Sequence, residues 1–264
     1  MSLGSIFRRG ERPPGQDAIR LIERDRAPDL LYAVGDIHGC HDKYSRIEAA
    51  IVADAERRSR GAVIVVLGDV VDRGPDSRAV IEHLLAAPPH GIDRFVLSGN
   101  HEAMMASFFD RPSHSHTWLS FGGAETLMSY GIDTGRWQIE RVKSKLIHYQ
   151  LQTFIPAEHM SFVAERPHLV RFGKLVCVHA AIDRSCSLSE QTERDLLWTR
   201  PGPETDADNG EMSGYVVVHG HTPVKDVFVS PLRINLDTGA FAGGPLSAAR
   251  FVAGHFDGLI SSAS

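Results

Sequence analysis

Short, predominantly apolar runs recur along the chain, and a glycine-centred turn or a histidine follows each of them. The runs are Leu30–Val34, Ala62–Leu67, Arg94–Leu97, Leu175–Val178 and Tyr215–Val218. Runs of this length and β-branched composition are typical of strands buried on both faces, although periodicity alone leaves a fragment of buried helix as the alternative. We therefore predict a strand at each run.

Between these runs, apolar residues recur three and four positions apart, which is the spacing of one helix face. This pattern predicts helices at His41–Arg58 and Ser77–Ala87, with Ser77 as the N-cap of the second helix. Strands that alternate with helices predict an α/β sandwich with mainly parallel strands over roughly the first hundred residues. Later runs, separated by glycine and proline, predict antiparallel strands of a second sheet. These runs are Val227–Val229, Arg233–Leu236 and Ala248–Val252.

The strand signals disappear between Met104 and Ala164, and this segment predicts several helices inserted into the domain. The aromatic residues expected to pack there are Trp118, Phe121, Trp137 and Tyr149. We expect residues 1–27 to form a polar, partly disordered extension. Residues 28–260 should form one domain that carries the helical insertion at about 104–164.

Composition and charge narrow the class of protein. With 28 basic and 33 acidic residues the net charge is −5, which argues against a protein that coats nucleic acid but leaves room for a local basic pocket. Three cysteines without a Cys-x-x-Cys pair favour a reducing cytosol over a disulfide framework. No apolar run approaches the ~20 residues of a membrane-spanning helix, and no signal peptide is evident, so we expect a cytoplasmic protein without a membrane partner.

Polar side chains follow the predicted strands. They lie in the runs GDIHG at 35–39, GDVVDRG at 68–74 and GNHE at 99–102, and single histidines follow two later strands at positions 179 and 221. In open α/β folds ligands bind beyond the carboxyl ends of strands, and glycine permits close approach of the backbone there. Mixed Asp, His and Asn ligands are typical of Mn, Fe or Zn. Two metals that share a carboxylate would use all of these groups, whereas one metal would leave several unused.

Each motif alone also has an ordinary structural interpretation. A Gly-Asp pair after a strand is often a turn with an Asx hydrogen bond, a histidine at a strand end is often structural, and an Asp-Arg pair is usually a surface ion pair. Three glycine-led strand ends in order, with two further histidines behind them, favour a functional site instead.

The three runs resemble the signature motifs of PPP-type serine/threonine phosphatases of the bacterial and phage branch, within the calcineurin-like metallophosphoesterase superfamily. The runs HA at 179–180, LLWTR at 196–200 and GHT at 220–222 are similar to later motifs of that branch. The resemblance spans roughly residues 30–253. It implies a four-layer-like α/β sandwich, with two central mixed sheets flanked by helices.

The resemblance also implies a role for each matching residue. The implied metal ligands are Asp36, His38, Asp69, Asn100, His179 and His221. They would hold two divalent ions, with Mn expected first and Fe, Zn or Ni as alternatives, and Asp69 would bridge them. A hydroxide between the metals would attack phosphorus in line. The implied phosphate-binding residues are Arg73, Arg200, Asn100 and His101, and His101 would also protonate the leaving oxygen while Asp72 orients its ring.

Several neighbouring residues carry weaker expectations. Proline occupies position 223, where broader metallophosphoesterases often have another histidine ligand, so the first metal would have only three protein ligands. We expect His219 to support the site or the fold rather than to bind metal. We expect peripheral or structural roles for Cys40, His41, His114 and His116. The run WLSFGGAE at 118–125 resembles a segment of bacterial relatives, and we hypothesise that it lies near the metal cleft and shapes substrate access.

The leading functional prediction is removal of phosphate from phosphoserine or phosphothreonine proteins, with turnover of small phosphoesters. The alternative is hydrolysis of a phosphoanhydride, in diadenosine tetraphosphate or at RNA 5′ ends. Asp72 and Glu102 favour the phosphatase, because symmetrical tetraphosphatases commonly have Ala-Arg-Gly and His-Asp at these places. A non-catalytic, metal-stabilised binding module is disfavoured because every matching position is intact. The sequence sets no expectation for the oligomeric state.

Overall fold

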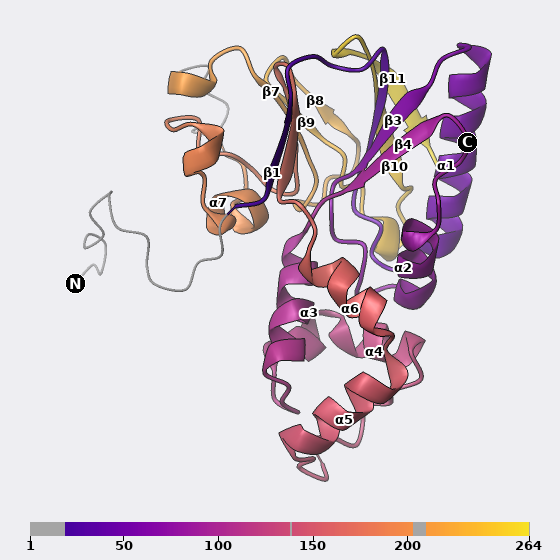
Figure 1. Ribbon diagram of the computed structural model, residues 1–264, viewed down its shortest axis with the longest axis vertical. Coiled ribbons are helices and arrows are strands. Elements are labelled where there is room, and N and C mark those ends of the chain that lie inside the picture. The colour runs from indigo at the N-terminus through magenta and orange to yellow at the C-terminus, as the bar shows by residue number, and fades with distance from the viewer. Residues whose placement is uncertain (1–18, 138, 203–209, 264) are drawn as a thin grey trace.

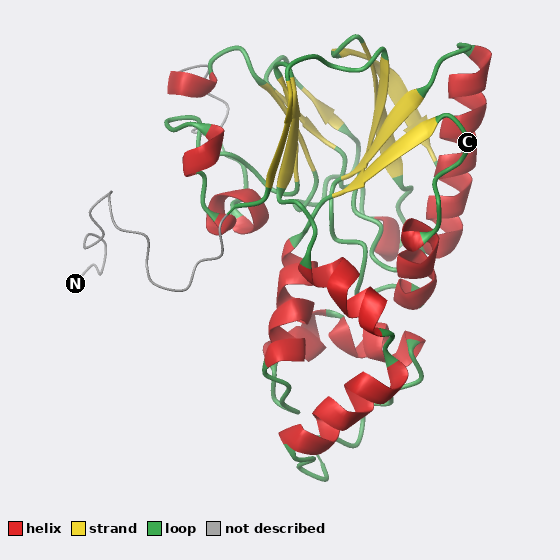
Figure 2. Ribbon diagram, in the orientation of Figure 1, coloured by secondary structure: helices red, strands yellow, loops and turns green. Residues whose placement is uncertain are grey.

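Two β-sheets pack face to face, and helices cover both outer faces and one end of the pair (Figure 1, Figure 2). The computed structural model describes residues 19–137, 139–202 and 210–263. Its α-helices are α1 (His41–Arg57), α2 (Ser77–Leu85), α3 (Asn100–Asp110), α4 (Gly123–Ser129), α5 (Ser144–Phe154), α6 (Ala157–Ala164) and α7 (Glu193–Trp198). Short 3₁₀ helices include η1 (Thr117–Phe121), η2 (Leu188–Glu190), η4 (Gly210–Met212) and η5 (Ala240–Ala242).

One sheet has five strands in the order β11-β10-β2-β3-β4. Its strands are β2 (Leu30–Val34), β3 (Ala62–Val66), β4 (Ile92–Val96), β10 (Ser247–Val252) and β11 (His255–Ser261). The strands β2, β3 and β4 are parallel, and β10 and β11 are antiparallel additions. The other sheet has six strands in the order β1-β5-β6-β7-β9-β8. Its strands are β1 (Leu21–Arg24), β5 (Leu169–Phe172), β6 (Leu175–Val178), β7 (Val216–His219), β8 (Phe228–Val229) and β9 (Arg233–Asn235).

The apolar runs are continuous because both faces of the central strands are covered. In β2, Tyr32 packs with Ile47 in the core beneath α1, and the adjacent Leu31 packs with Val218 between the two sheets. Helices α1 and α2 lie beside the five-stranded sheet, and α7 lies beside the six-stranded one (Figure 1). The prediction of an α/β fold with two mixed sheets flanked by helices is therefore confirmed.

The N-terminal segment departs from the expectation of a polar extension over residues 1–27. Residues 1–18 lie outside the described residues, but Leu21–Arg24 forms β1 and pairs in parallel with β5. Leu21 packs on the outer core of this sheet and Ile22 packs between the sheets. Only two apolar residues mark this strand, so the sequence pattern shows no run there.

The late strands also differ from the predicted antiparallel second sheet. The strand β9 pairs in parallel with β7, and only β8 is antiparallel to it. The predicted strand at Ala248–Val252 lies in β10, which joins the first sheet beside β2, with the unpredicted β11 as its outer neighbour. The strand β5 was also not predicted. These partners lie far apart in the sequence, and the local pattern contains no information about which sheet a strand joins.

Helices α3 to α6 form a group at one end of the sandwich (Figure 1). Trp118 and Trp137 are buried there as predicted, but Phe121 is 54% exposed and Tyr149 is 65% exposed. Helix α5 buries Ile147 and Leu151, so Tyr149, two positions from each, lies on the opposite face. Within the described ranges, no helix is long and apolar enough to cross a membrane.

Candidate metal centre

The predicted site residues converge on the loops that follow four strands and on the first turn of α3. Asp36 and His38 follow β2, and Asp69, Asp72 and Arg73 follow β3. Asn100 and His101 begin α3, His179 follows β6, and His221 follows β7. Parallel strands in each sheet deliver their carboxyl ends to one edge, so residues from both sheets meet there.

Strained backbone is concentrated in these loops. Most of the non-glycine residues with positive φ in the described part of the chain are site residues, namely His38 (45°), Asp69 (47°), Asp72 (74°), Arg73 (68°) and His221 (66°). A positive φ is unfavourable for residues with a Cβ and persists only where the surroundings enforce it. The fold therefore holds these side chains in fixed directions at an energetic cost, which supports a functional role for the loops.

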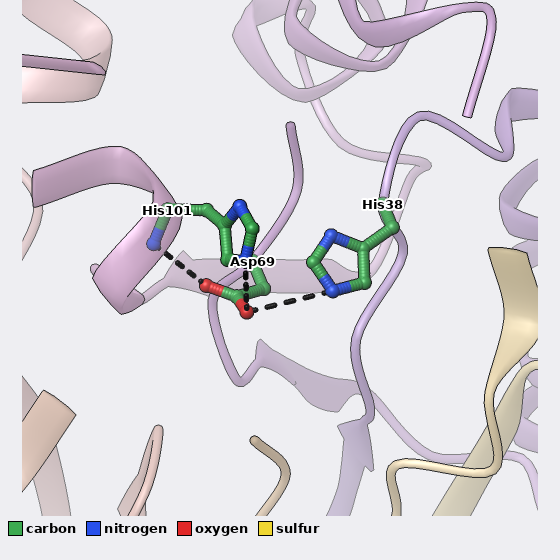
Figure 3. A group of neighbouring side chains, drawn as sticks. All are labelled: His38, Asp69 and His101. Atoms are coloured by element: carbon green, nitrogen blue, oxygen red, sulfur yellow. Dashed lines mark hydrogen bonds and ion pairs between the residues drawn. The ribbon is translucent and has the colours of Figure 1, made fainter. Parts of the chain in front are cut away.

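The first cluster consists of His38, Asp69 and His101 (Figure 3). Asp69 Oδ2 lies 3.5 Å from His38 Nε2 and 3.9 Å from His101 Nε2. The backbone N–H of His101 donates to Asp69 Oδ1, which fixes the carboxylate. All three residues are buried, so few water molecules can solvate the carboxylate and the imidazoles.

The second cluster shares Asp69 with the first and adds His179 and His221. His179 Nε2 lies 3.4 Å from Asp69 Oδ1, and the facing ring nitrogens of His179 and His221 lie 3.2 Å apart. Asn100 Oδ1 lies 2.9 Å from both imidazoles. Asp69 belongs to both clusters, so its carboxylate would contribute a ligand oxygen to a cation held in either of them.

Three of the histidines in these clusters, His38, His179 and His221, are neutral at physiological pH. Burial lowers the pKa of His38 to about 3 and that of His221 to about 4, and burial also lowers the pKa of His179. Metal ions bind the neutral imidazole, so no proton has to be displaced. Backbone carbonyls of Val71 and Leu67 lie 2.9 and 3.0 Å from the Nδ1 atoms of His38 and His179, which leaves Nε2 to face the cluster.

Three buried carboxyl groups, of Asp36, Asp69 and Asp237, lie close enough to interact electrostatically. Among the described residues, Asp36 Oδ1 has no hydrogen-bond partner, while Oδ2 accepts from the backbone of His221. A Cβ on Gly220 would collide with that orphaned oxygen, so the position requires glycine. Burial first and then the charge of Asp237 raise the pKa of Asp36, and burial raises the pKa of Asp237 to about 6. Unpaired carboxylates, neutral imidazoles and an amide oxygen fit two divalent cations.

Asp237 was missed in the sequence analysis. It directly follows the predicted strand Arg233–Leu236, as Asp36 and Asp69 follow theirs, but Leu236 stands before it where a glycine stands before those two residues. Its position at a strand end was therefore the only signal in the sequence that could have identified Asp237.

His101 and Asp72 form a buried acid pair beside the clusters. Asp72 Oδ2 lies 2.6 Å from His101 Nδ1 and also accepts from the indole of Trp118, while Oδ1 accepts from Thr126. Burial lowers the pKa of His101, but Asp69 and Asp72 outweigh it and raise the pKa overall.

The prediction that Ser77 caps the N-terminus of α2 is wrong. Ser77 is the first residue of the helix, and its hydroxyl oxygen accepts a hydrogen bond from the backbone N–H of Asp72.

Asp72→Asn should move the basic limb of the pH–rate profile to lower pH. The Asp72 carboxylate raises the pKa of His101, so its neutralisation lowers that pKa, and the acid form is lost earlier as pH increases. The profile of kcat for a phosphoserine peptide, whose alkoxide leaving group needs a proton, measures this shift. An unchanged or alkaline-shifted limb would contradict the predicted role of His101 as proton donor.

Glu102 anchors the loop that carries Asp69. Its Oε2 accepts from the backbone N–H groups of Gly99 and Asp69 at 2.7 and 2.8 Å. Its Oε1 accepts from those of Val70 and Val71 at 2.9 and 3.2 Å. A fully buried carboxylate with four backbone donors determines where Asp69 lies.

Glu102→Gln should lower the free energy of unfolding by about 2–3 kcal/mol, because an amide N–H₂ would face buried N–H donors. Burial and the charge of Asp69 raise the pKa of Glu102 to about 7, so thermal melts at pH 8 compare the ionised wild type with the variant. The control Glu82→Gln removes only an exposed pair with Arg78 and should change stability by less than about 1 kcal/mol. Equal melting temperatures for the two variants would refute the anchoring role.

The two predicted phosphate-binding arginines act on residues of different clusters. The Arg73 Nη2 atom lies 3.0 Å from His101 Nε2, beside the first cluster. Arg200 is exposed, but its charge acts on His221 and contributes to that residue's lowered pKa, after the larger effect of burial. Two cationic groups therefore flank the clusters in a chain that is acidic as a whole.

The other histidines near the motifs do not join the clusters. His219 is fully buried, and its ring nitrogens lie near Gly220 O and the Arg233 guanidinium. His41 contacts His83 on the helical face of the five-stranded sheet. Residues 118–125 lie beside the centre as predicted, because Trp118 contacts Asp72 and the backbone carbonyl of Gly122 lies 3.4 Å from the Arg73 amide nitrogen. Their effect on substrate access stays a prediction.

Comparisons with known proteins agree with this geometry. Residues 30–255 match the family model of the calcineurin-like phosphoesterases. The asymmetrical bis(5'-nucleosyl)-tetraphosphatase PrpE of Bacillus subtilis is 27% identical over 239 residues, which cover 83% of this chain and 89% of that protein. The protein of the same name from Anoxybacillus flavithermus is 25% identical over 237 residues, with the same coverage. A crystal structure named for a diadenosine tetraphosphatase has a TM-score of 0.61 at 22% identity, covers 92% of this chain and 98% of its own, and shows the shared fold. Because the family model covers most of the chain, the protein is a member of the calcineurin-like phosphoesterase family.

Proposed function

We propose that the protein hydrolyses the phosphoanhydride bridge of dinucleoside tetraphosphates. The observation that carries this proposal is the similarity to bis(5'-nucleosyl)-tetraphosphatases over nearly their full length, together with a site that fits two cations. The proposal reverses the order of the sequence predictions, in which the anhydride was the alternative.

The residues of the chain would bind, orient and protonate the substrate. Arg73 and Arg200 can each present a planar pair of N–H donors to phosphoryl oxygens. His101, held by Asp72, can donate a proton to the leaving oxygen. When bound, two divalent cations supply hydroxide near neutral pH and neutralise phosphoryl charge, and we propose Mn, with Fe, Zn or Ni as alternatives.

The bond changes follow from the substrate. An oxygen atom from water forms a bond to one phosphorus of the bridge, and the adjoining P–O–P bond breaks. The leaving phosphate keeps the bond electrons, and the proton balance is completed by His101 and solvent. A cut of the kind named for the asymmetrical relatives would yield a nucleoside monophosphate and a nucleoside triphosphate.

The second candidate is the removal of phosphate from phosphoserine or phosphothreonine, as in PPP-type phosphatases. The His101–Asp72 pair favours it, because an alkoxide leaves far less readily than a phosphate chain and needs a proton donor. Asp72 holds the ring of His101 and favours its protonated form, which assists the cleavage of such an ester more than the cleavage of an anhydride.

A side-by-side assay tests both candidates. The Mn-loaded protein is given diadenosine tetraphosphate, a phosphopeptide library, 5′-triphosphorylated RNA and p-nitrophenyl phosphate, and kcat/KM is compared. We expect diadenosine tetraphosphate to have the highest value by at least about tenfold. A higher value for phosphopeptides or RNA would overturn the proposal, and no turnover of any substrate with Mn, Fe, Ni or Zn would indicate a binding module.

A further inference from the structure

An exposed phenylalanine lies at the edge of the metal centre, and the reactions described above assign it no role. Phe241 lies in η5 and remains 38% exposed although its ring contacts two site residues. The Arg73 guanidinium carbon lies 4.5 Å from the centre of its ring. The His38 ring meets it in a T-shaped contact, with 5.2 Å between the ring centroids.

The way in which Arg73 is held leaves its donors available. Among the described residues, the Arg73 guanidinium forms no ion pair with a carboxylate, and its only hydrogen bond is to the His101 side chain. A carboxylate would compete with phosphate for the guanidinium N–H groups, whereas an aromatic face attracts the cation without accepting those donors along the guanidinium plane. Phe241 can therefore fix the guanidinium while leaving it able to bind an anion.

The loop that carries Phe241 is itself bonded to helix α1 on the outer face of the five-stranded sheet. Lys43 Nζ donates to the carbonyl oxygens of Ala240 and Gly244 at 2.5 and 2.7 Å. Gly239 and Gly243 have φ values of 66° and 96°, which allow the chain to turn sharply on both sides of η5. The position of the ring is thus set by the folded chain before any substrate binds.

We propose that Phe241 is a positioning residue for Arg73 and holds its guanidinium by a cation–π contact. Hydrogen bonds from Lys43 fix the loop that carries Phe241. The ring keeps the guanidinium beside His101, at the place where it would meet a phosphoryl oxygen. The inference rests on the proposed function only in so far as Arg73 binds a phosphoryl group. It holds for an anhydride or an ester.

The test measures phosphate affinity in a double-mutant cycle with the full-length, Mn-loaded chain. The variants are Phe241→Leu, Phe241→Trp, Arg73→Ala and the double variant Arg73→Ala with Phe241→Leu. Calorimetry gives the Kd for inorganic phosphate, and p-nitrophenyl phosphate gives KM and kcat. Phe241→Leu should weaken phosphate binding and raise KM by about threefold to thirtyfold, the range of a cation–π contact, with kcat changed less than about threefold.

Rescue and coupling distinguish positioning from a general structural role. Phe241→Trp should restore phosphate affinity to near the wild-type value, and Phe241→Leu should have no further effect in the Arg73→Ala background. Lys43→Met should weaken phosphate binding in the same direction through the loop. Phe256→Leu, at a phenylalanine that is 41% exposed on β11, is the matched control and should leave affinity unchanged.

The opposite outcomes are equally clear. An effect of Phe241→Leu that persists undiminished without Arg73, or that equals the effect of Phe256→Leu, would overturn the positioning role. Failure of the proposed function would look different, because diadenosine tetraphosphate would not be turned over while the phosphate affinities still followed the cycle.

Discussion

Asp69→Asn is expected to abolish metal-dependent hydrolysis, with a loss in kcat of at least about a thousandfold. Asp69 belongs to both candidate clusters, and its two oxygens lie 3.5 Å from His38 Nε2 and 3.4 Å from His179 Nε2. An asparagine keeps the shape but has no negative charge and only one oxygen, so it cannot bridge two cations. Elemental analysis should show fewer than two bound metal ions per chain.

Thermal melts separate loss of metal from loss of fold. The EDTA-treated variant should melt close to the EDTA-treated wild type, and most of the stabilisation that Mn gives the wild type should be absent. The matched control is Asp42→Asn, because Asp42 is an exposed aspartate on α1 that pairs with Arg46. Full metal content and activity in Asp69→Asn would contradict the bridging role.

His101→Asn is expected to show a loss that depends on the leaving group. For a phosphoserine peptide, kcat should fall by roughly 10²–10⁴-fold, the usual contribution of a general acid. For p-nitrophenyl phosphate, or for a tetraphosphate whose leaving phosphate chain is already a stable anion, the loss should be about tenfold or less. Rates across a series of leaving groups of increasing pKa measure this dependence.

A loss of equal size for all leaving groups would count against proton donation and would point to a role of His101 in binding alone. Metal content should stay at the wild-type value, since the Asp69 carboxylate still accepts from the backbone N–H at position 101. His148→Asn, at an exposed histidine of α5, is the matched control for the substitution itself. It should have no effect on either substrate class.

The central strands and the helices between them could be predicted because their pattern is local. Leu30–Val34 and Leu175–Val178 are apolar on both faces, and the structure places strands at these same residues. The strand β1 escaped prediction because it sits at a sheet edge with two apolar residues only. The parallel pairing of β9 with β7 escaped because a local pattern does not identify a strand's partner.

The candidate site also contains residues that a local sequence pattern predicts and one residue that only the fold brings there. Asp36, His38 and Asp69 could be proposed from glycine-led strand ends, because carboxyl ends of neighbouring parallel strands meet at one edge. Phe241 could not be found this way. It is one ordinary apolar residue in a glycine-rich loop, and only the fold and the hydrogen bonds from Lys43 to that loop bring it to Arg73.

By itself, the sequence determined the α/β class and the strand ends that carry the polar residues, and these follow from periodicity and from the short offsets between each strand and its polar side chains. The link from these residues to a phosphohydrolase came from the family resemblance. The tertiary structure alone decided which sheet each late strand joins, that Asp237 lies close enough to Asp36 to interact with it electrostatically, and that the Phe241 ring lies against Arg73. The physical reason is that these contacts join segments many residues apart, whose meeting depends on how the two sheets pack against each other.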